Sequence, residues 1–203
     1  MTAQHPASPT PAMIDFEPVA RQVAQLVREV REEQLAGPTP CEKYAVHHLL
    51  AHLVELTAAF RDAAGKRRGP TTDTPPGGAM PVLDDDWRVR LPRRLDELVA
   101  AWRSPDAWRG TTRAGGVTLP GDVAGRVALN ELVVHGWDLA RAVGRPYAPD
   151  TAALQSSYEL LEPTEDDPGG EGIFGTPVDV PRDAPLLDRV VGRAGRSPAW
   201  PAG

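Results

Sequence analysis

The chain has 203 residues, of which 41% are hydrophobic and 25% are charged, as is typical of a globular protein with one sizeable core. Its net charge of −6 excludes the basic footprint of a nucleic-acid-binding protein. An apolar run of the roughly 20 residues that cross a bilayer is missing, as is a basic N-terminus followed by an apolar segment, so neither a membrane nor a secreted protein is expected. Cys41 is the single cysteine, which excludes an internal disulfide and fits a reducing, cytoplasmic location.

Helices dominate the predicted secondary structure. Residues 1–12 are rich in proline and are expected to form a loose tail. Beyond them, apolar residues recur at helical spacing in five segments: residues 15–34, 42–64, 91–102, 121–143 and 151–161. Glycines follow three of these segments as stop signals, at Gly37, Gly65 and Gly144.

The connections between these helices are long. Residues 65–86 are rich in proline, glycine, threonine and aspartate, and residues 111–119 alternate weakly, as in a short hairpin. Pro92 fits only the first turn of a helix, so any helix before it is expected to end or kink there. The chain after residue 163 is again rich in proline and glycine, and one short helix is expected near residues 185–194.

Together these elements predict an all-α fold. The expected architecture is a four-helix bundle with long crossover connections and a short C-terminal extension. The bundle is expected to comprise residues 13–162, and the extension residues 163–203. Since bundles of this kind place metal sites between facing helices, ionisable residues on inward faces are the first candidates for function.

Three such residues suggest a metal site. Glu131 and His135 are four residues apart in a helical segment, so their side chains lie one turn apart on one face. His52 lies on the inward stripe of the second helical segment. Two imidazoles and one carboxylate from facing helices could hold a divalent metal and leave a coordination position open, as catalytic zinc sites do. The plainer alternative is that Glu131 pairs with an arginine and that both histidines are hydrogen-bonded core residues.

Three further residues are weaker candidates for a functional role. His48, one turn before His52, could lie at the mouth of the site as a residue facing substrate, or form a two-histidine face with His52. Cys41 precedes the second helical segment, where a thiol can have a lowered pKa, although a small buried residue is the simpler interpretation. Asp138 could orient a metal ligand or form an exposed pair with Arg141.

The residues around these positions resemble a known family. Thr39-Pro-Cys-Glu-Lys-Tyr-Ala-Val-His-His-Leu-Leu-Ala-His-Leu-Val54 and Asn130-Glu-Leu-Val-Val-His-Gly-Trp-Asp-Leu-Ala-Arg-Ala142 are similar to the DinB/YfiT-like metal-binding superfamily. The more similar branch is related to the N-terminal domain of mycothiol-dependent maleylpyruvate isomerase, and the tail through Gly195-Arg-Ser-Pro-Ala-Trp200 resembles its stand-alone members.

The resemblance implies a fold, a metal and partners. It places the metal triad on His52, Glu131 and His135, the residues that spacing had singled out. It implies a DinB-like bundle, often a homodimer, with zinc as the usual metal and nickel as another. The implied partners are a small-molecule thiol, mycothiol, and a small electrophile, rather than nucleic acid or membrane.

The chain departs from the family pattern at two places. Tyr44 stands where a tryptophan is common, and His47-His48 stand where arginine and aspartate are frequent. The isomerase also has a further C-terminal domain that this sequence is not expected to contain. Three functional hypotheses follow: a mycothiol-dependent transferase or isomerase, a non-catalytic metal-binding scaffold related to stress, and a metal-dependent hydrolase with His48 as its base.

Overall fold

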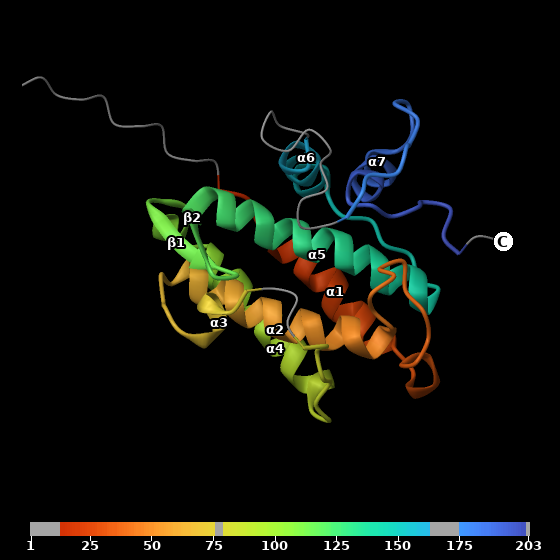
Figure 1. Ribbon diagram of the computed structural model, residues 1–203, viewed down its shortest axis with the longest axis horizontal. Helices are drawn as coiled ribbons and strands as arrows, with labels where there is room; N and C mark the ends of the chain where they lie inside the picture. The colour runs from red at the N-terminus through yellow and green to blue at the C-terminus, as the bar shows by residue number, and fades with distance from the viewer. Residues whose placement is uncertain (1–12, 76–78, 163–174, 202–203) are drawn as a thin grey trace, which may run out of the picture.

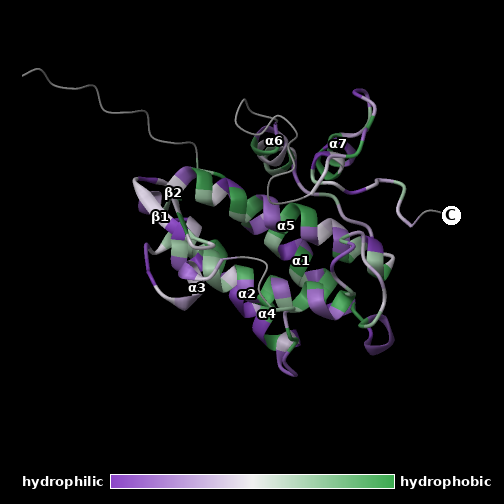
Figure 2. Ribbon diagram, viewed as in Figure 1, coloured by the Kyte–Doolittle hydropathy of each residue, from purple (hydrophilic) through white to green (hydrophobic). Residues whose placement is uncertain are grey.

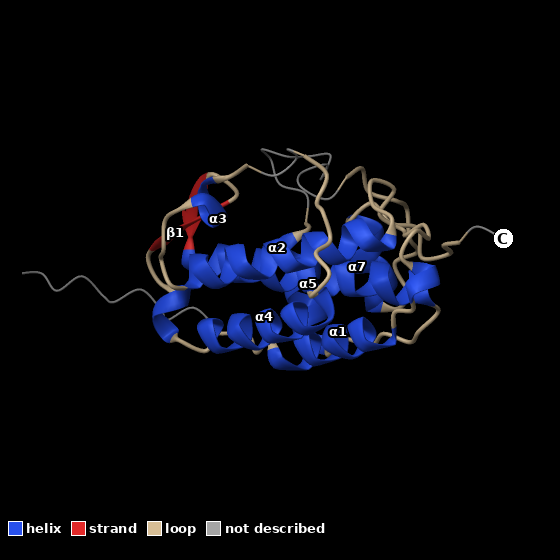
Figure 3. Ribbon diagram, turned by 90° about the horizontal axis from the view of Figure 1, so that it is seen from below, coloured by secondary structure: helices blue, strands red, loops and turns tan. Residues whose placement is uncertain are grey.

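Four long helices pack around one core in the computed structural model, which describes residues 13–75, 79–162 and 175–201. These helices are α1 (Glu17–Glu29), α2 (Val46–Ala64), α4 (Trp87–Trp102) and α5 (Gly121–Val143). α2 packs against α4 and α5, and α1 packs against the same two helices, so the four close into a bundle (Figure 1). Figure 3 shows the bundle helices running lengthwise, with β1 near one end. The predicted all-α bundle is confirmed.

Smaller elements complete the fold. They are two 3₁₀ turns (Glu32–Gln34 and Pro105–Trp108), the short helix α3 (Pro70–Asp73), the strands β1 (Thr111–Ala114) and β2 (Val117–Pro120), and the helices α6 (Thr151–Leu160) and α7 (Leu186–Arg193). The expected long connection therefore contains α3, and the short helix expected in the C-terminal extension is α7. The tail proposed for residues 1–12 lies outside the described residues.

The first two helices are shorter than predicted. α1 ends at Glu29 because Val30 is extended, and Arg88 donates a hydrogen bond of 2.9 Å to the Val30 carbonyl that leaves the helix. α2 begins at Val46 because the residues before it fold back, and the Val46 amide donates to the Gly37 carbonyl. The spacing of apolar residues predicted longer helices because it carries no information about these tertiary contacts.

The prediction that a helix before Pro92 would end or kink there is wrong as to the end. α4 begins at Trp87, four residues before the predicted start, and it continues through Pro92 in its second turn. Proline cannot supply the amide hydrogen for the helical bond, so this extension costs stability. Burial of the large Trp87 side chain, which is 5% exposed, offsets that cost.

The predicted hairpin is present and joins α4 to α5. Thr111 pairs with Pro120 and Ala114 with Val117, and the two residues between the strands are Gly115 and Gly116. Both glycines have positive φ, which a two-residue turn of this handedness needs and which glycine adopts at little cost.

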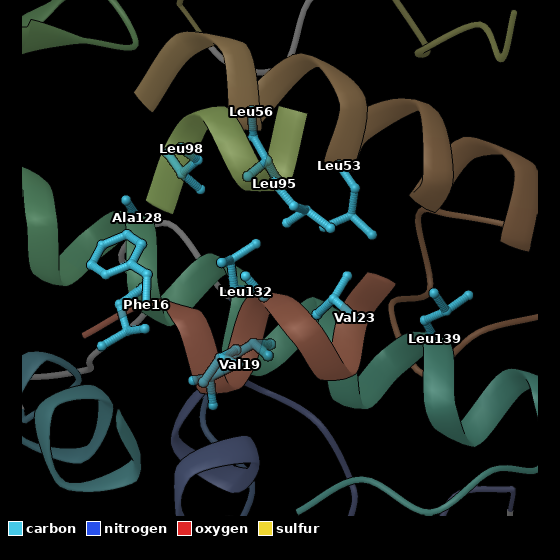
Figure 4. Close-up of a cluster of buried hydrophobic side chains, with 14 of the residues drawn as sticks. Phe16, Val19, Val23, Leu53, Leu56, Leu95, Leu98, Ala128, Leu132 and Leu139 are labelled. Carbon is cyan, nitrogen blue, oxygen red and sulfur yellow. The ribbon is translucent and has the colours of Figure 1, made fainter. Parts of the chain in front are cut away.

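The core is made by the inward stripes of the bundle helices. Hydrophilic and hydrophobic residues are interspersed along the bundle helices (Figure 2), and hydrophobic side chains meet between the helices (Figure 4). The cluster contains Phe16, Val19, Val23, Leu53, Leu56, Leu95, Leu98, Ala128, Leu132 and Leu139. No helix in the described part of the chain is both long and apolar enough to span a membrane.

α5 is the most enclosed helix of the fold. α1 and α2 pack against it from within the bundle, and α6 and α7 cover its far side (Figure 1). As a result, each residue from Ala128 to Ala140 is buried, including Glu131, His135 and Asp138. Buried polar and charged side chains need partners, so this enclosure draws the ionisable groups of α5 into close contacts.

Asp62 fastens the end of α2 to the following loop. It is 8% exposed, and its carboxylate accepts hydrogen bonds from Arg67 at 2.6 Å, Thr71 at 2.8 Å and Arg61 at 2.9 Å. Burial raises the pKa of Asp62, but these donors outweigh burial and bring the pKa below its ordinary value of 3.8. The ionised form is therefore favoured in the folded protein.

The Asp62→Asn variant is expected to lower the free energy of unfolding by about 2 kcal/mol at neutral pH, because charge-assisted hydrogen bonds are lost. The stability that Asp62 supplies is present above pH 3.8 and is lost as pH falls through the lower folded pKa. The difference between wild type and variant should therefore shrink in acid, as measured by urea unfolding. The control is Glu97→Gln, which breaks a more exposed pair with Arg61 and should cost below about 1 kcal/mol.

Candidate metal centre

α2 and α5 bring the three predicted ligands together. His52 projects from α2, while Glu131 and His135 project from adjacent turns of α5. The Glu131 Oε2 atom lies 3.5 Å from His52 Nε2 and 3.2 Å from His135 Nε2. One potential ligand atom from each residue lies within 4.8 Å of the other two. The structure thus gathers the triad that helical spacing had indicated.

These distances fit a tetrahedral ion. Nitrogen and oxygen ligands lie about 2 Å from zinc, so two of them on a tetrahedron are about 3.3 Å apart. Glu131 Oε2 is buried, and its neighbours at the site are the imidazole nitrogens of His52 and His135. A buried carboxylate is costly unless a positive partner lies beside it, and a metal ion between these three side chains would be such a partner. The donor set of two nitrogens and one oxygen suits a divalent metal such as zinc.

The charges at the site favour a positive ligand. Burial raises the pKa of Glu131, but hydrogen bonding and charge attraction from the His135 and His52 imidazoles outweigh burial and hold the pKa well below its ordinary value. Burial lowers the pKa of His135, but Asp138 and Glu131 outweigh it and raise this pKa to about 9. Glu131 is therefore a carboxylate at neutral pH, and in the metal-free protein His135 carries the proton that a metal ion would displace.

One side of the triad is open to solvent. The His52 side chain is 25% exposed, whereas His135 and Glu131 are 6% and 9% exposed. The Tyr44 ring packs against the His52 ring at a centroid distance of 5.2 Å. Burial is the largest cause that raises the pKa of Tyr44, so its hydroxyl keeps its proton. His52 is thus the most exposed of the three side chains that would hold an ion.

Two residues outside the triad support His135. Its Nδ1 atom lies 2.9 Å from Asp138 Oδ2, and Arg196 Nη2 lies 3.1 Å from the same oxygen. Asp138 is fully buried, so its predicted exposed pairing with Arg141 is wrong; Arg141 donates instead to the Trp200 carbonyl. The alternative, in which Asp138 orients a ligand, agrees with this geometry. Arg196 was missed because it lies far along the chain, in a segment without helical spacing.

His48 and Cys41 lie on either side of the start of α2. His48 Nδ1 accepts a hydrogen bond from the Ala45 amide at 3.4 Å, and its ring packs on His47 at 3.8 Å. The three side chains that converge are His52, Glu131 and His135, and the role of His48 at the mouth of the site stays a prediction. Cys41 lies five residues before α2 begins, so the helix terminus does not lower its pKa. Burial raises that pKa, which agrees with the simpler interpretation of Cys41 as a partly buried small residue.

Comparisons with known proteins assign the chain to a family. The family described as mycothiol maleylpyruvate isomerase N-terminal domain matches residues 16–140, a range that contains all three proposed ligands. The chain belongs to this family. Two curated relatives, the uncharacterized proteins Rv0738 and MT0763 of Mycobacterium tuberculosis strains H37Rv and CDC 1551, are each 29% identical over 189 residues. The match covers 86% of this chain and 91% of each relative.

Solved structures show the same fold. The crystal structure of the mycothiol-dependent maleylpyruvate isomerase aligns with a TM-score of 0.56 and 18% identity, and that of a histidine-to-alanine mutant of it aligns with 0.57 and 17%. Each alignment covers 73% of this chain and 67% of the other. At this identity the likeness establishes the bundle as a fold of the isomerase family, while the chemistry has to be argued from the site.

Proposed function

We propose that the protein is a divalent-metal-dependent enzyme whose cosubstrate is mycothiol, a low-molecular-weight thiol. The enzyme either transfers this thiol to a small electrophile or uses the thiol to isomerise the electrophile. The observation that carries the proposal is the convergence of His52, Glu131 and His135, which each offer one potential ligand atom within 4.8 Å of the others around the buried Glu131 carboxylate. Membership of the mycothiol maleylpyruvate isomerase N-terminal domain family supports the choice of thiol. Zinc is the metal best suited to the donor set, and nickel is compatible with it.

The residues of the site have separate roles in this proposal. His52, Glu131 and His135 hold the ion with three ligands and leave one position for a substrate atom. A divalent ion bound there would lower the pKa of a coordinated thiol and favour its thiolate form. Tyr44 packs against the His52 ring and would limit the movement of that ligand. The surrounding α5 residues exclude water from the other side.

The maleylpyruvate reaction itself is not part of the proposal. The family match covers the N-terminal domain of that enzyme, and the structural match covers 67% of it. The hydrolase alternative needs a general base, and His48, the residue named for that role, is in the first turn of α2 with its Nδ1 atom 3.4 Å from the Ala45 amide. A non-catalytic metal-binding scaffold uses the same three ligands and is therefore the outcome that an experiment must separate from the enzyme.

Calorimetric titration of the zinc-loaded protein with mycothiol separates these functions. We expect saturable binding of the thiol that disappears after chelation of the zinc. Glu131→Gln should show no thiol binding, whereas the matched control Glu97→Gln, far from the site, should bind as wild type does. Zinc bound at one equivalent without any thiol response would contradict the enzyme and favour the scaffold.

A further inference from the structure

Arg196 connects the C-terminal segment to the metal centre. It follows α7, yet it is 5% exposed and lies against Asp138 on α5. Arg196 Nη2 donates to Asp138 Oδ2 at 3.1 Å, and Arg196 Nε lies 3.3 Å from Asp138 Oδ1. The planar guanidinium thus faces both oxygens of one carboxylate, which fixes the plane of that carboxylate more firmly than a single donor would.

The turn after α7 places this guanidinium. The Gly195 amide donates to the Gly192 carbonyl and the Arg196 amide to the Val191 carbonyl, the two hydrogen bonds of a Schellman helix end. Gly195 has a φ of 75°, as the reversal of direction at such an end requires. Arg196 Nη1 also donates to the Ala194 carbonyl at 2.6 Å. The side chain is therefore held by its own turn before it meets Asp138.

Asp138 transmits this constraint to His135. Its Oδ2 atom is shared between Arg196 and His135 Nδ1, at 3.1 and 2.9 Å. An Nδ1–H that donates to the carboxylate leaves the lone pair on Nε2, the nitrogen that faces Glu131. Without Arg196, the fully buried Asp138 carboxylate would keep only His135 Nδ1 of these two partners and would lose the guanidinium that fixes its plane.

We propose that Arg196 is a positioning residue of the metal centre, which acts through Asp138 to hold His135 Nε2 toward the ion. The inference rests on the proposed metal site and extends it: the C-terminal segment is a functional part of the site rather than a cover on the bundle. Outer partners of this kind typically change metal affinity about 10- to 100-fold.

The test measures zinc affinity by competition with a chromophoric chelator. Arg196→Met keeps much of the side-chain volume and removes the charge and donors, and it should weaken zinc at least about tenfold. Arg196→Lys keeps the charge without the planar fork and should recover part of that loss. The matched control is Arg193→Met, since Arg193 anchors the same helix to the Tyr158 carbonyl at 2.7 Å without contacting Asp138. It should bind zinc within about twofold of wild type.

A double-mutant cycle distinguishes positioning from general stability. If Arg196 acts through Asp138, Asp138→Asn combined with Arg196→Met should bind zinc no more weakly than Asp138→Asn alone. Multiplicative losses, or wild-type affinity in a folded Arg196→Met, would overturn the inference. If Arg196→Met does not fold, Arg196→Lys decides, because affinity equal to wild type would overturn the role of the fork. A wild-type protein that takes up no zinc would overturn the proposed metal site as well.

Discussion

Replacing Glu131 with glutamine is expected to weaken zinc binding by on the order of a hundredfold or more, since loss of a direct ligand should exceed the 10- to 100-fold effect of an outer partner. Glutamine keeps the shape of the side chain but removes the charge that attracts the ion. Glu131 is buried on α5, its Oε2 lies 3.2 Å from His135 Nε2, and it is the carboxylate of the three converging side chains. Competition titration with a chelator measures the change.

The folded state should survive this substitution. In the metal-free protein Glu131 is a buried carboxylate beside two imidazoles, and an amide of equal size does not require a counter-ion. We therefore expect a helical circular dichroism spectrum that matches wild type. Zinc affinity unchanged in a folded Glu131→Gln would show that Glu131 is a structural ion-pair residue and not a ligand.

Replacing Gly136 with alanine is expected to lower the free energy of unfolding by about 2–4 kcal/mol, because overpacking of this kind costs roughly 1–3 kcal/mol and a hydrogen bond about 1 kcal/mol more. A Cβ at Gly136 would meet the Tyr147 hydroxyl and would lie 2.6 Å from Cζ of the same ring. The Tyr147 hydroxyl donates to the Leu132 carbonyl at 2.9 Å, so displacing the ring also breaks this bond. Urea unfolding measures the loss.

In a Tyr147→Ala background, the effect of Gly136→Ala on the free energy of unfolding is expected to change sign. Once the ring is removed, the added methyl group meets no obstacle from it, and alanine is favoured over glycine within a helix by up to about 1 kcal/mol. Gly136→Ala should therefore be neutral or stabilising in that background. A loss of equal size in both backgrounds would contradict the proposed clash with Tyr147.

The sequence predicted the site helices better than the site surroundings. Glu131 and His135 could be paired because an interval of four residues fixes a common helix face, and α5 has the predicted bounds because Gly144 ends it with positive φ. His52 could be added because it shares the apolar stripe of α2. These inferences depend on helical periodicity alone, which stays the same whatever other elements pack around the helices.

Tertiary contacts determine the features of the fold that helical periodicity could not predict. Arg196 reaches Asp138 from 58 residues away, through a turn whose geometry depends on Gly195. Pro92 is tolerated within α4 because the helix gains burial of Trp87. Cys41 was predicted to lie next to a helix start, but α2 begins only at Val46, where the Val46 amide donates to the Gly37 carbonyl. In each case a partner distant in the sequence outweighs the local preference.

The central claim is that His52, Glu131 and His135 form a metal centre, and elemental mass spectrometry of freshly purified protein tests it most directly. Wild type should contain close to one equivalent of a divalent metal per chain, with zinc or nickel as the expected ion. The variants His52→Ala, Glu131→Ala and His135→Ala should each lose it, while His48→Ala should keep it. Metal absent from wild type after reconstitution with zinc or nickel, or lost from His48→Ala but kept in Glu131→Ala, would contradict the account.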